Sequence, residues 1–120
     1  MTADSRTILF SGGGTVGHLA PGFALAEALE MRGVTCIFAT PGEAVERDWF
    51  EGRHPSRTLL AHRLPRRPLD AVRFPFRFRR AAKAARALLD ELRPAALVAL
   101  GGWPCAPAAW AAKGARVPLV

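Results

Sequence analysis

The chain has 120 residues, half of them hydrophobic and few of them aromatic, which suits one α/β domain with a modest core. Its two cysteines, Cys36 and Cys105, are too few for a disulfide framework and lack metal-type spacing, so a reducing cytoplasm is the expected setting. The net charge of +7 comes entirely from residues 63–93, which hold ten basic and three acidic residues, so it marks a local patch and not a generally basic protein.

Short β-rich runs alternate with helical patterns along the chain. Strands are expected at residues 7–10, 35–40, 57–64 and 95–100. Helices are expected at residues 20–33, within 41–52, at 76–93 and at 108–114. The first helix would have Pro21 in its first turn and Gly33 at its C-terminal cap. The third helix carries an apolar stripe made of Ala81, Ala85, Leu88, Leu89 and Leu92.

The two ends of the chain and one loop complete the pattern. The start contains an early acidic residue and no apolar core, so it does not read as a secretory signal. A loop rich in proline and arginine is expected over residues 65–78. Residues 117–120 read as the opening of a further strand, so we expect the natural protein to continue beyond Val120.

A membrane span must be considered for residues 94–112, because these 19 residues carry no charge. The segment is interrupted by Pro94, Gly101, Gly102, Pro104 and Pro107, and a spanning helix broken in this way would leave backbone groups unpaired in lipid. Strand, loop and helix are the expected alternative. The regular alternation of strands and helices then predicts an α/β fold with a Rossmann-like parallel sheet covered on both faces, in a single domain over residues 1–120.

A glycine-rich loop follows the first strand, with the sequence Gly-Gly-Gly-Thr-Val-Gly-His at residues 12–18. Glycine permits positive φ and lets backbone N–H groups approach a ligand, and the following helix start favours phosphate. The spacing also fits a dinucleotide-binding loop, but that class expects an acidic residue at the end of the second strand, where Ala39 and Thr40 stand. Since Gly101 and Gly102 follow the fourth strand at the same edge, we expect a phosphate-bearing ligand rather than a mere tight turn.

His18 stands at the start of the first helix. A histidine there is commonly a capping or surface residue, but the positive end of a helix lowers the imidazole pKa and keeps the ring neutral. A neutral imidazole beside a phosphate site can accept a proton from an attacking hydroxyl. The residues alone leave both interpretations open.

The two glycine loops together resemble the MurG family of glycosyltransferases. The first loop of that family reads Gly-Gly-Thr-Gly-Gly-His, and residues 13–18 here read Gly-Gly-Thr-Val-Gly-His. The second reads Gly-Gly-Tyr-x-Ser-Gly-Pro, and residues 101–107 here read Gly-Gly-Trp-Pro-Cys-Ala-Pro. The similarity extends over essentially the whole chain, in the same element order, and covers the N-terminal half of a family member.

The resemblance implies a GT-B enzyme that transfers N-acetylglucosamine from UDP-N-acetylglucosamine to undecaprenyl-linked lipid I, giving lipid II for peptidoglycan. This half would bind the acceptor, a second domain would hold most of the donor, and no metal or cofactor would take part. The resemblance implies that His18 is the catalytic base for an inverting transfer. It assigns the loops that face the pyrophosphate and sugar nucleotide to Gly13, Gly14, Thr15, Val16, Gly17, Gly101, Gly102 and Trp103.

Three departures from the family pattern bear on the acceptor. Val16 replaces a glycine, so either the loop is reshaped or that position needs no positive φ. Cys105 and Ala106 replace serine and glycine, which removes a hydroxyl donor and some flexibility. Two alternatives follow: a related transferase that acts on another lipid or natural-product acceptor, and a non-catalytic module that binds membranes.

The basic patch of residues 63–93 interleaves cations with aromatic side chains. Such a stretch suits the headgroup zone of an anionic bilayer, and an acceptor with an undecaprenyl tail requires membrane proximity. A solvated helix face and nucleic-acid contact are the alternatives, but the chain shows no recognised nucleic-acid module. We therefore expect a peripheral protein on the cytoplasmic face of the bacterial inner membrane, with no nucleic-acid partner. The expected contact residues are Arg73, Phe74, Phe76, Arg77, Phe78, Arg79, Arg80 and Lys83.

Overall fold

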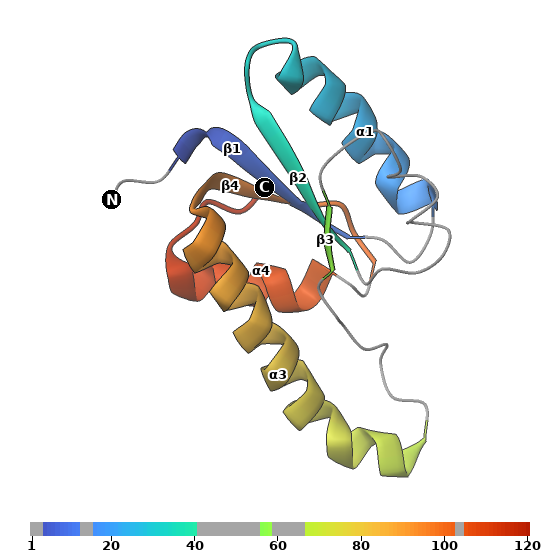
Figure 1. Cartoon of the computed structure of the whole chain (residues 1–120). Helices are drawn as coiled ribbons and strands as arrows, with labels where there is room; N and C mark the ends of the chain where they lie inside the picture. Colours follow the sequence, from blue (N-terminus) through green and yellow to red (C-terminus); the bar gives the residue numbers. More distant parts are fainter. Residues whose placement is uncertain (1–3, 13–15, 41–55, 59–66, 103–104) are drawn as a thin grey trace.

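The fold is a parallel sheet with helices on both faces. The computed structural model describes residues 4–12, 16–40, 56–58, 67–102 and 105–120. The strands pair in parallel in the order β3-β2-β1-β4, and they are β1 (Asp4–Ser11), β2 (Thr35–Thr40), β3 (Ser56–Thr58) and β4 (Pro94–Ala99). The helices are α1 (Val16–Glu30), α3 (Pro68–Leu92) and α4 (Ala106–Ala115). Helix α1 covers one face, and α3 and α4 cover the other (Figure 1). The α/β fold expected from the sequence is confirmed.

The side chains of β1 alternate between two apolar cores. Leu9 packs in a core with Leu97 and residues of α3 and α4. The next residue, Phe10, packs in the other core with Phe23 of α1 and Phe38 of β2, and the rings of Phe10 and Phe38 stack at 4.8 Å. Because successive residues of a strand point to opposite faces, a strand buried on both faces needs a continuous apolar run, and the sequence of β1 supplies it.

Helix α1 begins earlier than its sequence pattern predicted. It starts at Val16, so Pro21 lies inside the helix and not in its first turn. The helix buries the stripe of Leu19, Phe23 and Ala26 against the sheet. The proline removes one intrahelical donor, and packing of this stripe compensates for that loss.

The end of α1 agrees with the prediction. Gly33 has a φ of 82°, and the N–H of Val34 donates to the carbonyl of Leu29 at 3.1 Å. The N–H of Gly33 donates to the carbonyl of Glu30 at 3.0 Å. These two bonds form a Schellman cap, which requires the left-handed conformation that glycine adopts most easily.

Helix α3 occupies most of the segment that was predicted to be a loop. It starts at Pro68 and runs for 25 residues, with Pro75 inside it. Pro68 stands in the first turn, where its missing N–H costs nothing, and the N–H of Ala71 donates to the carbonyl of Arg67 at 3.1 Å. The loop prediction was therefore wrong, because the prolines were read as interruptions. The predicted stripe of α3 is confirmed: Ala81, Ala85, Leu88 and Leu89 are buried and Leu92 is partly buried.

The uncharged segment of residues 94–112 forms β4, a glycine loop and most of α4, as expected. After α4 the chain returns to the sheet beside β4. There the N–H of Leu97 donates to the carbonyl of Pro118 at 2.8 Å, and the N–H of Val120 donates to the carbonyl of Leu97 at 2.9 Å. Leu119 thus forms an isolated parallel bridge with Leu97 of β4, in the segment where the sequence predicted strand structure. None of the helices in the described ranges is both long and apolar enough to cross a membrane.

Two predictions fall outside the described residues. These are the short helix within 41–52 and most of the third strand, of which only Ser56–Thr58 is described. Cys36, in β2, is buried and its thiol donates to the carbonyl of Ala26 at 3.8 Å. Burial, and then the charge of Glu30, raise the pKa of the Cys36 thiol to about 11. It therefore acts as a small core residue.

Candidate functional site

The two glycine loops begin side by side at the carboxyl edge of the sheet. Ser11 pairs with Ala99 in register, and the N–H of Leu100 donates to the carbonyl of Ser11 at 2.8 Å. A Cβ on Gly12 would lie 2.9 Å from the Cβ of Leu100 and 3.3 Å from the carbonyl oxygen of Gly101. Only glycine fits at position 12, and its absent side chain brings the main chains of the two loops together.

The second loop turns sharply into α4. Gly101 and Gly102 have φ values of 98° and 80°, which residues with a side chain rarely adopt. The N–H of Cys105 donates to the carbonyl of Gly102 at 3.4 Å, and the Cys105 thiol donates to the same carbonyl at 3.1 Å. No side chain caps the start of α4 within the described residues. Helix α4 begins at the same sheet edge as the loops (Figure 1). Its first N–H groups have no partner within the helix, so they are available at this edge.

The first loop leads directly into α1. Val16, Gly17 and His18 form the first turn of α1, so the backbone of His18 lies at the positive end of the helix. A helical Val16 needs no positive φ, which decides between the two possibilities left open by its sequence. The side chain of His18, and all of Gly13, Gly14, Thr15 and Trp103, lie outside the described residues.

Gly22 brings α1 close to the second loop. A Cβ at this position would lie 2.7 Å from Cδ1 of Leu100 and 3.3 Å from Cε1 of Phe38. Gly22 was not among the predicted site residues, although a glycine inside a helical pattern often has a packing reason. Gly12 thus lies beside the Cβ of Leu100, and Gly22 lies beside the Cδ atoms of the same residue.

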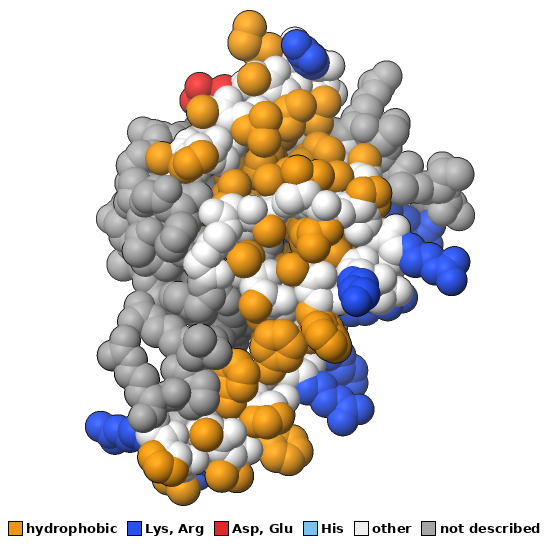
Figure 2. Space-filling model, turned by 180° about the vertical axis from the view of Figure 1, so that it is seen from behind, with side chains coloured by type: hydrophobic (Ala, Val, Ile, Leu, Met, Phe, Trp, Pro, Cys, Tyr) orange, Lys and Arg blue, Asp and Glu red, His pale blue; other side chains and the backbone are white. Residues whose placement is uncertain are grey.

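Cations of the basic patch lie on the exposed face of α3. Phe76 is 75% exposed, and it lines a cavity of about 300 Å³ with Arg73, Arg77 and Arg80. Leu69 and Val72 are exposed on the same side of the helix. Apolar and basic side chains gather over the lower part of the molecule, where α3 begins (Figure 2).

The three phenylalanines of this segment have different surroundings. Phe74 and Phe78 are half-buried and their rings lie 6.0 Å apart. Phe78 also meets Trp110 of α4 edge to face at 6.3 Å. Phe78 therefore packs against α4 and Phe74 packs beside Phe78, whereas Phe76 points outward with the exposed Arg79 and Lys83. Leu69 and Val72 were not among the predicted contact residues, because their segment was expected to be a loop.

The family follows from comparison with known proteins. Residues 8–120 match the family described as "Glycosyltransferase family 28 N-terminal domain". The chain belongs to this family. This family membership confirms the predicted resemblance to MurG. The resemblance was predicted from the sequences of the two glycine loops.

Two relatives of the family share the name "UDP-N-acetylglucosamine--N-acetylmuramyl-(pentapeptide) pyrophosphoryl-undecaprenol N-acetylglucosamine transferase". The relative from Nocardioides sp. is 37% identical over 118 residues, which are 94% of this chain and 32% of the relative. The relative from Chelativorans sp. is 38% identical over 119 residues, which are 96% of this chain and 31% of the relative. The chain therefore spans about one third of the length of these relatives.

Solved structures show the same fold. MurG from Acinetobacter baumannii superposes with a TM-score of 0.78 at 20% identity, over 97% of this chain and 34% of that protein. The calicheamicin glycosyltransferase CalG4 superposes with a TM-score of 0.61 at 18% identity, over 96% of this chain and 31% of that protein. The fold is thus that of the N-terminal half of GT-B glycosyltransferases, as expected.

Two of the departures from the family pattern have a local explanation. Val16 is compatible with the helical start of α1. Cys105 still donates to the backbone of the second loop, because its thiol reaches the Gly102 carbonyl where the family pattern has a serine hydroxyl. The loop conformation expected for the family is therefore compatible with Val16 and with Cys105.

The charged groups around the sheet have structural roles. Arg57 of β3 and Glu91 of α3 form an ion pair with N–O distances of 2.6 and 2.9 Å. The hydrogen bond from Arg57 holds the pKa of the Glu91 carboxyl below its usual range. Within the described residues, no three His, Cys, Asp or Glu side chains come together as a set of metal ligands.

Proposed function

We propose that this chain is the N-terminal, acceptor-binding domain of a glycosyltransferase that moves N-acetylglucosamine from UDP-N-acetylglucosamine to lipid I, forming lipid II. The observation that carries the proposal is the contact of Gly12 with Leu100 and Gly101. It brings two glycine loops and two helix starts to one edge of the sheet, where backbone N–H groups can bind a diphosphate. The names of the relatives supply the sugar nucleotide and the acceptor.

The chemistry would proceed by direct displacement. His18, in the first turn of α1, would accept the proton of the acceptor hydroxyl as that oxygen attacks the anomeric carbon. The bond from the anomeric carbon to the UDP oxygen breaks as the new glycosidic bond forms, so the configuration inverts. The helix dipole supports this role because it disfavours the protonated imidazole before the reaction. The second domain of the enzyme would hold most of the donor.

The outward face of α3 would bring this domain to the membrane. Leu69, Val72 and Phe76 are exposed beside Arg73, Arg77, Arg79, Arg80 and Lys83. Apolar side chains can enter the headgroup zone while each nearby cation contributes about 1 kcal/mol of attraction to anionic lipids. Such a surface would hold the protein as a peripheral component of the inner membrane, beside its lipid-linked acceptor.

The test is transfer by the full-length protein. Radiolabelled UDP-N-acetylglucosamine and lipid I in detergent should give labelled lipid II. Transfer to a different lipid or natural-product acceptor, with none to lipid I, would replace the proposed acceptor. Absence of transfer to any acceptor would favour a non-catalytic membrane-binding module.

A further inference from the structure

Ser11 has a buried hydroxyl that lacks a partner among the residues that the structure describes. The residue is 1% exposed at the last position of β1. Its Oγ atom forms no hydrogen bond with any described group. A buried hydroxyl without a hydrogen bond costs about 1–3 kcal/mol, so native proteins rarely retain one without a reason.

The neighbours of Ser11 in the described part of the chain offer no side-chain partner. Its register partners in the neighbouring strands are Ala39 and Ala99. Ser11 follows Leu9 by two positions, so it lies on the sheet face that α3 and α4 cover. On that face Ala108, in the first turn of α4, packs in the same core as Leu9 and Ala39. All of these neighbours are apolar.

The hydroxyl lies where the loops and a helix start meet. The carbonyl of Ser11 accepts from Leu100, the residue before Gly101, and Gly12 follows directly. Helix α4 begins at the same edge with no side-chain cap among the described residues (Figure 1). The peptide group between Ser11 and Gly12 is bonded on both sides, because its carbonyl accepts from Leu100 and its N–H donates to the carbonyl of Ala39 at 3.4 Å. The backbone that carries the hydroxyl is therefore held in place by the two neighbouring strands.

We infer that the Ser11 hydroxyl is a further binding residue of this site, donating a hydrogen bond to an anionic oxygen of the diphosphate that the two loops hold. This inference rests on the proposed function, since that function supplies the diphosphate. A hydroxyl can donate to an anion in a site with little water, and bonds to charged groups are about twice as strong as neutral ones. Ser11 lies two positions before the family motif of residues 13–18, so the glycine pattern alone did not mark it.

The experiment compares Ser11→Ala with Thr7→Val in the full-length protein. Thr7 lies in the middle of the same strand and on the same face, about 13 Å from Ser11, and it is also a buried polar residue. Binding of inorganic diphosphate is measured by calorimetry, the acceptor KM by transfer kinetics, and the free energy of unfolding in urea. Ser11→Ala should weaken diphosphate binding and raise the acceptor KM about tenfold each, with unfolding stability unchanged or raised. Thr7→Val should leave both binding measurements unchanged.

Other outcomes separate the two proposals. If Ser11→Ala lowers stability while diphosphate binding and the acceptor KM stay at wild-type values, the hydroxyl serves a partner within the protein and the inference is wrong. Unchanged binding together with unchanged stability also overturns it. A wild-type protein that binds diphosphate but transfers no sugar would disprove the proposed function alone, and the loss of diphosphate binding in Ser11→Ala would still support the role of Ser11.

Discussion

Gly12 lies against Leu100 so closely that a Cβ atom on Gly12 would be 2.9 Å from the Cβ of Leu100. Neither the Cβ of Leu100 nor the nearby Gly101 carbonyl belongs to the flexible end of a side chain. Gly12→Ala should therefore shift the two loops and lower the free energy of unfolding by about 1–3 kcal/mol. Urea unfolding measures this change.

A matched glycine provides the control for Gly12→Ala. Gly114 lies within α4, and a Cβ there would meet only the end of the Arg86 side chain, at 3.3 Å. Gly114→Ala should leave stability unchanged or raise it, because glycine inside a helix costs about 1 kcal/mol relative to alanine. Equal losses in both variants would contradict the close approach at Gly12.

Arg116 ends α4 in the left-handed conformation, with a φ of 59°. This conformation costs a residue with a side chain about 1–2 kcal/mol, and glycine avoids most of that cost. Arg116→Gly should raise the free energy of unfolding by about 1 kcal/mol.

Gly33 at the cap of α1 allows the reverse change. A Cβ on Gly33 would meet no neighbouring atom, but the residue has a φ of 82°, so Gly33→Ala should lower the free energy of unfolding by a similar amount. Denaturant unfolding of both variants checks the pair.

The Arg57–Glu91 ion pair should make stability depend on pH in the acid range. The pKa of Glu91 is lowered in the folded protein, first by the hydrogen bond from Arg57. The pair therefore contributes at pH values above the ordinary carboxyl pKa of 4.5 and is lost as pH falls through the lower, folded value. Arg57→Gln should reduce the loss of stability on acidification below about pH 4.5. Lys113→Gln, which leaves both the Arg57–Glu91 pair and the Arg86–Asp90 pair intact, should show the wild-type acid dependence.

His18 should determine the rate of transfer more than the binding of the acceptor. His18→Gln keeps a polar side chain at the start of α1 but removes the base. We expect kcat to fall by about 10²–10³, with the acceptor KM changed less than threefold. Steady-state kinetics of the full-length protein provide the measurement, and circular dichroism checks the fold. A kcat close to the wild-type value would exclude His18 as the base.

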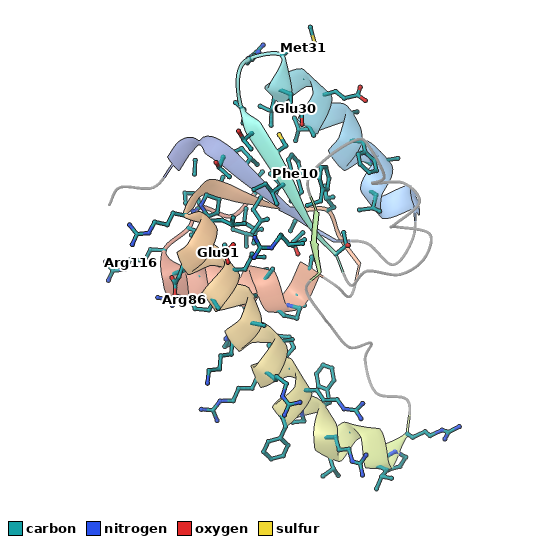
Figure 3. All side chains as sticks on the ribbon, viewed as in Figure 1. Phe10, Glu30, Met31, Arg86, Glu91 and Arg116 are labelled. Carbon is teal, nitrogen blue, oxygen red and sulfur yellow. The ribbon has the colours of Figure 1, made fainter. Side chains whose placement is uncertain are left out.

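Phe76 should contribute to membrane binding. We expect Phe76→Ser to reduce the fraction of protein that floats with vesicles containing anionic lipid about three- to tenfold, since it removes an exposed ring beside Arg73, Arg77 and Arg80. Met31 is 90% exposed and lies at the opposite end of the molecule from the start of α3 (Figure 3). Met31→Ser should leave flotation unchanged. A Phe76→Ser protein that binds vesicles as wild type does would show that another surface makes the contact.

The sequence by itself determined the order and type of the main elements. The apolar run of β1, the exact span of β2 and the Gly33 cap all follow from local chemistry, because each depends on residues that are neighbours in the chain. The stripe from Ala81 to Leu92 was equally readable, since helical spacing repeats within one element. The pattern of the two glycine loops was also sufficient to indicate the family.

The tertiary structure decided which residues meet. The contact between Gly12 and Leu100 joins positions 88 residues apart, and the burial of the Ser11 hydroxyl depends on α4 covering that face of the sheet. Packing also decided that Phe78 meets Trp110 of α4, with Phe74 beside it, while Phe76 stays exposed, and that α3 extends back to Pro68 through Pro75. The physical reason is the same in each case: burial free energy belongs to pairs of surfaces, and local propensity cannot specify which surface a side chain will face.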